Sequence, residues 1–442
     1  MRFYTKQFTD AVSPTNFLLT NPEVLRETVR TRGANVVRGL RNLLNDFDVE
    51  KGKLNISMTD KAAFEVGRNV ATAPGKVVFQ NDVFQLLQFE PATATQFQVP
   101  LLIFPPWINK YYILDLKPEN SFIRWALSQG HSVFVVSWVN PDERLAAKTW
   151  EDYYNEGISE AIDATLRACD HDQVHAIGYC IGGTLLASGL AHMAANDDKR
   201  VKMATFFAAQ VDFSEPGDLE VFIDEKQLAN LDNMMAKTGF LDASAMSTSF
   251  NMLRANDLIW TFVINNYLMG KDPYPFDLLY WNADSTRMPR ALHMFYLQQM
   301  YQHNRLSQPG GITLNGTPVD LRRISIPVYL QASREDHIAP YNSVFKAAGL
   351  YQGPVRFVLA GSGHIAGVIN PPTSGKYCHW TNDAAPGELD AWLAGSTEHK
   401  GSWWPDWHAW AAPQLGEQVP ARAPGSGGLE VIEDAPGTYV RV

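Results

Sequence analysis

The residues best suited to chemistry begin with a cysteine between two glycines. The segment GYCIG at 178–182 lies between the apolar run VHAIGY and the run TLLASGLAHMAA, which predict a strand and a helix. Gly-x-nucleophile-x-Gly between a strand and a helix is the pattern of a nucleophile elbow, whose glycines leave room for a strained turn. Cys180 would then lie at the positive end of the helix, which favours the thiolate form. The alternative is a buried cysteine beside an ordinary glycine turn.

Two later segments supply the acid and the base that an elbow nucleophile needs. Asp336 lies in SREDHIAP and His364 in GSGHIAG, so the chain order is nucleophile, acid, His. Each follows an apolar run, IPVYLQAS or VRFVLA, and we expect the three side chains to converge at the carboxyl edge of one sheet. His175, in a predicted strand, and His379, in a predicted loop, fit this order less well. His337 is a candidate supporting group beside the triad.

An acyl-transfer site also needs two N–H donors for the oxyanion. The first is the backbone N–H of Ile181, directly after the nucleophile. The loop PPWINK at 105–110 follows an earlier predicted strand and is the place for the second, but its two prolines have no N–H. We expect Ile108 to be this donor, with Trp107 and Asn109 as alternatives. The proline pair can also simply stiffen a turn.

Cysteine in place of serine indicates the class of substrate. A thiolate that attacks a thioester exchanges sulfur for sulfur, so neither leaving group makes the acyl-enzyme a deep trap. The acyl-enzyme therefore forms reversibly. Cys180 under a cap is better suited to acyl transfer than to amide hydrolysis.

Apolar runs alternate with helical patterns along most of the chain. Strands are predicted on both sides of Asn81-Asp82 and again from LLIF at 101–104 onward, which predicts a mostly parallel sheet with helices on both faces. With the elbow, the predicted class is an α/β-hydrolase fold with an inserted cap. The expected parts are an N-terminal helical segment (1–74), two parts of the core (75–212 and 324–412), the cap or lid between them (213–323) and a Pro/Gly-rich tail (413–442).

Regions outside the predicted core leave alternatives open. Residues 21–47 predict one helix with arginines on its outer face, which we interpret as a solvated face rather than a surface for anions. The aromatic insertion is either a lid that excludes water or a plain hydrophobic core or dimer interface. The WWPDWHAW run at 403–410 is expected to pack on the protein, with polymer or partner contact as the alternative. The tail is expected to be extended or disordered.

Composition argues against several classes of protein. A net charge of −10 disfavours nucleic acid as the main partner. The three cysteines form neither a disulfide framework nor a zinc pattern, which fits a reducing cytoplasm and no metal. The first residues lack the apolar core of a signal peptide, and no apolar run approaches the ~20 residues that span a bilayer. We therefore expect a cytoplasmic protein without a transmembrane segment.

Several segments are long enough to be specific to one family. They are PPWINKYYILDLKPENSFIRWALSQGHSVFVVSWVNPD, GYCIGGTL, NDLIWTFVINNYL with DPYPFDLLYWNADSTRMP, SREDHIAP, SGHIAGVINPP and HKGSWWPDW. Together they closely resemble the polyhydroxyalkanoate synthases, most closely the class I enzymes, over nearly the whole chain. Members of that family usually have a longer region before the segment similar to MRFYTKQFTDAVSPTNF, a departure that bears on granule targeting and dimer strength.

The resemblance implies an enzyme that polymerises (R)-3-hydroxyacyl-CoA, with a preference for short chains such as 3-hydroxybutyryl, into polyester. CoA thioester is the substrate and CoA the product, so no cofactor is expected. By position in the matching motifs, Cys180 is similar to the nucleophile that carries the chain and His364 to the general base. Asp336 is similar to the partner of the base, or to a group that activates the 3-hydroxyl.

The resemblance also implies a homodimer on the surface of cytoplasmic polyester granules, with no separate protein subunit. Lys110 and Arg124 are interpreted as surface charge, with contact to CoA phosphates as the alternative. The alternative function is a cysteine-type α/β-hydrolase such as a thioesterase, because it shares Gly-x-Cys-x-Gly and the order of the triad. The product separates the two, since hydrolysis gives free acid and synthesis gives polyester.

Overall fold

The computed structural model describes residues 2–48 and 52–442, which belong to two compact units. The helical unit is formed within residues 1–65 and 243–285, and the sheet unit within 66–242 and 286–442. Part of the predicted insertion therefore groups with the N-terminal segment, and the rest belongs to the sheet unit.

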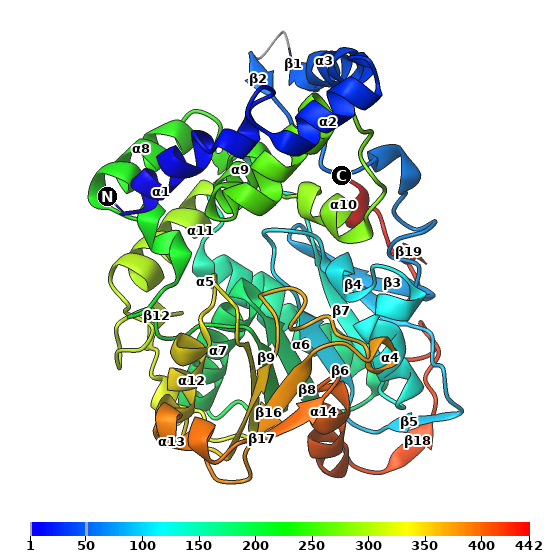
Figure 1. Ribbon diagram of the computed structural model, residues 1–442. Helices are drawn as coiled ribbons and strands as arrows, with labels where there is room; N and C mark the ends of the chain where they lie inside the picture. The colour runs from blue at the N-terminus through cyan, green and yellow to red at the C-terminus, as the bar shows by residue number, and fades with distance from the viewer. Residues whose placement is uncertain (1, 49–51) are drawn as a thin grey trace. The chain divides into compact units, whose positions relative to one another are not determined.

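The sheet unit is built around an 11-stranded sheet (Figure 1). The neighbouring pairs from β7 to β15 in the spatial order are parallel, and the outer pairs on both sides are antiparallel. The predicted α/β class is confirmed, and continuous apolar runs such as VHAIGY form the buried central strands. In spatial order the strands are β17 (Thr397–Lys400), β16 (Cys378–Thr381), β15 (Val355–Ala360), β14 (Val328–Ser333), β9 (Val201–Phe207), β8 (Val174–Tyr179), β6 (Leu101–Phe104), β7 (Val133–Trp138), β4 (Phe84–Phe89), β3 (Gly75–Gln80) and β19 (Glu433–Asp434).

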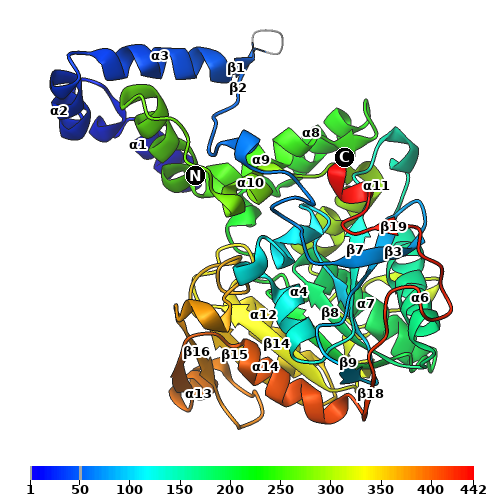
Figure 2. The same ribbon diagram turned by 90° about the vertical axis from the view of Figure 1, so that its right-hand side faces the viewer.

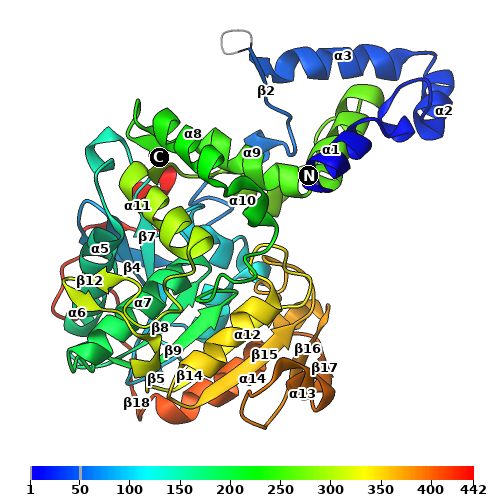
Figure 3. The ribbon, with the colours of Figure 1, turned by 90° about the vertical axis from the view of Figure 1, so that its left-hand side faces the viewer.

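Helices cover both faces of this sheet. Successive side chains of β9 point to opposite faces, and each contacts residues in or next to helices on its own side. The ring of Phe206 lies 5.9 Å from that of Tyr351, directly after α12 (Tyr341–Leu350). The next residue, Phe207, points to the opposite face, where its ring lies 5.4 Å from Phe122 of α4 (Phe122–Ser128) and 5.0 Å from Trp403 before α14 (Trp404–Ala411). Figure 3 shows α12 and α14 on opposite faces of β14 and β15.

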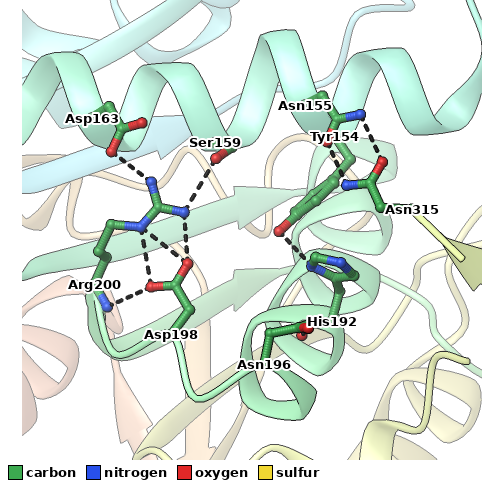
Figure 4. Close-up of polar contacts among 9 residues, drawn as sticks. All are labelled: Tyr154, Asn155, Ser159, Asp163, His192, Asn196, Asp198, Arg200 and Asn315. Atoms are coloured by element: carbon green, nitrogen blue, oxygen red, sulfur yellow. Dashed lines mark hydrogen bonds and ion pairs between the residues drawn. The ribbon is translucent and has the colours of Figure 1, made fainter. Parts of the chain in front are cut away.

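The helix that follows β8 is apolar on all sides and is buried. It is α7 (Ile181–Ala195), and a helix without a polar face requires such a place. At its far end, the Tyr154 hydroxyl lies 2.8 Å from His192 Nδ1, and Arg200 pairs with Asp198 and Asp163 at 2.6 Å each (Figure 4). These contacts fix α7 and the start of β9 to the helical stretch α5 (Trp150–Asp152), the π-helical η6 (Tyr153–Ser159) and α6 (Glu160–Cys169).

The sheet unit contains further helices and strands outside the large sheet. The part of the insertion that lies in this unit contributes α8 (Glu225–Met235), α11 (Arg290–Phe295) and the π-helical η10 (Tyr296–Gln302). Two-residue strands form the pairs β10 (Phe240–Leu241) with β11 (Met288–Pro289) and β12 (Thr313–Leu314) with β13 (Thr317–Pro318), and α13 is Leu389–Ala394.

The C-terminal tail is extended, as one of the two predicted alternatives states. Its strand β18 (Gln418–Pro420) pairs with β5 (Thr95–Phe97), and β19 pairs with β3 at the edge of the large sheet. Figure 2 shows this segment in red, running along the sheet unit from β18 to β19.

In the helical unit, the predicted single helix at 21–47 is wrong. The chain forms α2 (Pro22–Arg30) and α3 (Ala34–Asp46), because Arg32 and Gly33 adopt φ angles of 51° and 84°. These left-handed values end a helix. The other elements are α1 (Arg2–Ala11), β1 (Phe47–Asp48), β2 (Lys53–Leu54), α9 (Ala243–Leu253), the π-helical η8 (Asn256–Trp260) and η9 (Val263–Leu268), and α10 (Asp277–Ala283).

The arginines of α2 and α3 are exposed, as predicted for a solvated face. Helix α3 packs closely on η9, because a Cβ at Gly39 would overlap the backbone oxygen of Tyr267. Among the described residues, none of the helices combines the length and the apolar character that crossing a membrane requires.

Candidate active site

Cys180 lies in the tight turn between β8 and α7. Its φ and ψ of 52° and −126° belong to a region that residues other than glycine rarely adopt. A Cβ at Gly178 would overlap the Cα of Gly183, and a Cβ at Gly182 would overlap the oxygen of Phe104. Only glycine fits at positions 178 and 182, so the turn has the geometry of the predicted elbow.

The structure brings the predicted acid and base together. His364 Nδ1 lies 2.7 Å from Asp336 Oδ2, and the Asp336 side chain has no exposed surface. The other carboxylate oxygen, Oδ1, accepts hydrogen bonds from the backbone N–H groups of Ile338 and Ala339, at 2.9 Å each. Both oxygens of Asp336 are therefore engaged, one in its own loop and one on the imidazole.

The side chain of Cys180 lies close enough to the ring of His364 for its charge to affect the pKa of the imidazole. Because Asp336 occupies Nδ1, the nitrogen left for the sulfur is Nε2. Burial lowers the pKa of His364, but the charges of Asp336 and Cys180, with the hydrogen bond to Asp336, outweigh burial and raise this pKa well above its usual value. A raised pKa suits His364 to take up the proton of the Cys180 thiol, which nucleophilic attack requires.

The acid and the base are positioned by two adjacent parallel strands. Asp336 follows β14 and His364 follows β15, and the two loops are joined by a hydrogen bond of 2.9 Å from the N–H of Glu335 to the oxygen of Ser362. Adjacent parallel strands end at the same edge of a sheet, which explains why residues 28 positions apart meet.

The other histidines lie elsewhere. His175 lies in β8, as predicted, where it is buried with Nε2 2.9 Å from Thr205 Oγ1. The prediction of a loop for His379 is wrong, because it lies in β16 and pairs there with Ala360. His337 follows Asp336, and its backbone oxygen accepts a hydrogen bond from the N–H of Asp218.

The predicted oxyanion donors lie close to the elbow. The N–H of Ile181 is in the first turn of α7, where no intrahelical acceptor exists. A Cβ at Gly182 would lie 2.6 Å from the oxygen of Pro105, so the loop at 105–110 borders this turn. Ile108 belongs to that loop, and its role as the second donor stays a prediction.

Thr286 hydrogen bonds the backbone of the loop at 105–110, and the sequence analysis did not identify it. Its hydroxyl donates a hydrogen bond to the oxygen of Trp107, and its N–H donates to the oxygen of Ile108 at 3.0 Å. In a trans peptide the C=O of one residue points away from the N–H of the next, so this contact orients the N–H of Ile108 away from Thr286. The only sequence signal for Thr286 is its place in the motif DPYPFDLLYWNADSTRMP.

Two tyrosines from the insertion also lie near the sulfur. Tyr296 and Tyr301 are buried, with ring centroids 5.3 Å apart. Burial first, and then the nearby charge of Cys180 among other contributions, raises the pKa of both phenols. They therefore stay protonated and form a largely apolar wall beside Cys180.

The interpretation of Lys110 as surface charge is wrong, because it is only 8% exposed. Arg124 is partly buried, where it donates a hydrogen bond of 2.6 Å to the oxygen of Thr72 and lies 3.6 Å from the carboxylate of Asp115. Within residues 2–48 and 52–442, no cluster of His, Cys, Asp and Glu side chains is arranged to hold a metal ion.

The prediction that the tryptophan-rich run packs on the protein is confirmed for Trp403, Trp404 and Trp407. None of these three side chains has exposed surface. Their indole N–H groups all donate hydrogen bonds within the sheet unit. Polymer contact through these rings would require the segment to unfold.

Comparison with known proteins gives two family matches. Residues 1–126 match a family described as the poly-beta-hydroxybutyrate polymerase N-terminus, and residues 100–371 match one described as the alpha/beta hydrolase fold. The second match spans more than half of the chain, and it confirms the predicted α/β-hydrolase fold.

Relatives align along the whole chain. The chain is 53% identical over 440 residues to a poly(3-hydroxyalkanoate) polymerase subunit of Rhizobium meliloti (strain 1021), covering 100% of this chain and 72% of the relative. It is 51% identical over 441 residues to a poly(3-hydroxyalkanoate) polymerase of Methylorubrum extorquens, covering 100% and 73%. It is 45% identical over 447 residues to the polymerase subunit of Cupriavidus necator, covering 100% and 75%.

Proposed function

The chain belongs to the poly(3-hydroxyalkanoate) polymerase family, and from this premise we propose that it polymerises (R)-3-hydroxyacyl-CoA through an acyl thioester on Cys180. The observation that carries the proposal is the linked arrangement of Cys180, His364 and Asp336 at one edge of the sheet. A nucleophile, a base and a group that orients the base are the parts that acyl transfer needs.

The first step loads an acyl group. His364 takes the proton of Cys180, and the thiolate attacks the thioester carbonyl of the acyl-CoA. The N–H groups of Ile181 and Ile108 stabilise the oxyanion. The bond between the carbonyl carbon and the sulfur of CoA then breaks, and His364 returns its proton to the departing CoA thiolate.

The second step extends the chain. His364 removes the proton from the 3-hydroxyl of another substrate, and the alkoxide attacks the acyl thioester on Cys180. An ester bond forms, the bond from carbon to the Cys180 sulfur breaks, and the sulfur takes the proton from His364. Repetition of the loading step returns the longer chain to Cys180.

We assign to Asp336 the orientation of His364 rather than direct activation of the 3-hydroxyl. Its Oδ2 is hydrogen bonded to the imidazole, its Oδ1 accepts two backbone hydrogen bonds, and its side chain has no exposed surface. A substrate hydroxyl would have to displace one of these contacts to reach it.

Water must be kept from the acyl thioester for synthesis to exceed hydrolysis. The buried pair Tyr296 and Tyr301 beside Cys180 supports this part of the proposal, because these rings occupy space near the sulfur. A preference for short chains such as 3-hydroxybutyryl-CoA, a homodimer, and a place on cytoplasmic polyester granules belong to the proposal through the class I resemblance.

The test supplies the purified chain with (R)-3-hydroxybutyryl-CoA and follows both the release of CoA thiol and the fate of the acyl carbon. We expect insoluble polyester from the wild type and neither CoA release nor polyester from Cys180→Ala. Cys378→Ala is the matched control, because this thiol lies in β16 outside the elbow, and it should retain synthesis. Stoichiometric free acid in place of polyester would favour the thioesterase alternative.

A further inference from the structure

Two buried tryptophans contact the loop that carries His364. The indole N–H of Trp403 donates a hydrogen bond of 2.7 Å to the backbone oxygen of Gly367, and that of Trp404 donates one of 2.9 Å to the oxygen of Val368. Both side chains are fully buried. The two acceptors follow His364 by only a few residues, so the indoles hold the C-terminal end of its loop.

Trp403 also touches the residue that holds the nucleophile. Its ring centroid lies 5.0 Å from that of Phe207, the last residue of β9. The backbone oxygen of Phe207 accepts a hydrogen bond of 2.9 Å from the N–H of Cys180. The indole of Trp403 therefore packs against Phe207, which holds the turn of Cys180, and also hydrogen bonds the loop that carries His364.

The tryptophan segment is itself tied to the strands that precede the acid and the base. Asp406 accepts a hydrogen bond of 2.9 Å from the hydroxyl of Tyr329 in β14 and one of 3.0 Å from Arg356 Nε in β15. The Ser402 hydroxyl accepts a hydrogen bond of 3.1 Å from the N–H of Trp404. Figure 3 shows α14 alongside β14 and β15. These contacts tie the tryptophan segment to β14 and β15, the strands that precede Asp336 and His364.

The loop needs such support because glycines make up much of it. GSGHIAG at 361–367 contains three glycines, and glycine restricts the backbone least. The N–H of Gly361 donates a hydrogen bond of 2.7 Å to the oxygen of Cys378, which holds the start of the loop. Without the indoles, the buried oxygen of Gly367 would lose its hydrogen bond, and that of Val368 would keep only the bond of 3.2 Å from the N–H of Asn370. An unsatisfied buried oxygen favours a shift of the loop.

We propose that Trp403 and Trp404 are positioning residues that hold the loop at 361–368 so that His364 faces Cys180. This inference rests on the proposed function, because only there is His364 the base of Cys180. A displacement of about 1 Å in a catalytic group costs roughly 100-fold in rate, so small movements of this loop matter.

The test replaces each indole by a ring without the N–H, in Trp403→Phe and Trp404→Phe. Trp407→Phe is the matched control, because Trp407 is equally buried in α14 but donates its hydrogen bond to Thr205 Oγ1, at 3.0 Å. The first readout is the rate of Cys180 alkylation by iodoacetamide between pH 5 and 9, followed by mass spectrometry of the Cys180 peptide. This readout reports the pairing of sulfur and imidazole without turnover.

We expect His364→Gln to slow the alkylation of Cys180 and to change its pH profile. Trp403→Phe and Trp404→Phe should shift the profile toward that of His364→Gln and lower kcat about tenfold, with KM changed by about twofold or less. Trp407→Phe should keep the wild-type profile. In the His364→Gln background, Trp403→Phe should change the profile no further.

Wild-type alkylation profiles and kcat in folded Trp403→Phe and Trp404→Phe would overturn the inference and leave the proposed function intact. A wild-type profile in His364→Gln would instead contradict the pairing on which the proposed function depends. Benzothienylalanine at position 403 provides a second variant if the phenylalanine variants do not fold. It keeps the size and shape of indole and lacks only the N–H, so it must give the same shift if the inference is correct.

Discussion

His364 Nδ1 lies 2.7 Å from Asp336 Oδ2, and this carboxylate has no exposed surface. The contact assigns one ring nitrogen to the acid and leaves the other for Cys180, which lies close enough for its charge to affect the pKa of the ring. Because the second oxygen of Asp336 accepts two backbone N–H groups, the carboxylate has no freedom to rotate toward a substrate. Nucleophile, base and acid thus come together from three connections, which follow β8, β14 and β15.

This geometry predicts that Asp336→Asn impairs loading and elongation by the same factor. The oxygen of the amide should stay on the two backbone N–H groups that Oδ1 accepts, so its NH2 group faces Nδ1 and can only donate to it. This favours the wrong tautomer, so both steps that use His364 should slow roughly 10²- to 10⁴-fold. Single-turnover CoA release measures loading, and polymer yield from a preloaded enzyme measures elongation. Asp172→Asn, at a carboxylate that is 93% exposed, is the control. Normal loading with blocked elongation would instead assign Asp336 to the 3-hydroxyl.

Thr286 provides a second test of the site. Thr286→Val removes the hydroxyl that donates to the oxygen of Trp107 and keeps the branched shape and the N–H bond to Ile108. We expect kcat to fall about tenfold with little change in KM, because the oxyanion forms only after substrate has bound. Thr286→Ser keeps the hydroxyl and should restore most of the rate. Equal kinetics for the two variants would show that this hydrogen bond does not position the loop.

The elbow predicts a strong asymmetry between two glycine substitutions. Gly182→Ala would place a methyl group against the backbone oxygens of Phe104 and Pro105, which cannot move without shifting β6. Unfolding in urea should show a loss of about 1–3 kcal/mol, together with a loss of activity. Gly349→Ala, in α12 with open space around the added group, should instead gain about 0.5–1 kcal/mol. Equal stability of the two variants would argue against the packing at the elbow.

Buried histidines predict a loss of stability at acidic pH. Burial lowers the pKa of His175 to about 3, so it stays neutral in the folded protein, whereas the unfolded chain takes up a proton near pH 6.5. The unfolded state then binds more protons, and the free energy of unfolding must fall as pH decreases below about 6.5. The slope from one such group is about 1.4 kcal/mol per pH unit.

Urea unfolding between pH 7.5 and 5 measures this slope. We expect His175→Gln to make it shallower, because one buried group that resists protonation is removed. His303→Gln, at an exposed position, is the control and should leave the slope unchanged. An identical pH dependence in wild type and His175→Gln would contradict the assignment.

The chain by itself determined the central strands and the order of the site residues, because both depend on local patterns. The short apolar runs at 101–104 and 355–360 predict strands, and the structure has strands with the same bounds. Neighbouring residues also predict that Cys180 lies in a tight turn and that Asp336 and His364 follow strands. Local pattern failed at 32–33, where two left-handed residues interrupt a periodicity that continues on both sides.

Only the tertiary structure decided which distant residues hold the site in place. Thr286 reaches the loop at 105–110, and Trp403 and Trp404 reach the loop of His364, across many intervening residues. No periodicity or motif spacing encodes such contacts, because they depend on how the strands are ordered in the sheet and on which face each helix covers. A buried backbone oxygen needs a donor, but the identity of that donor is settled by packing.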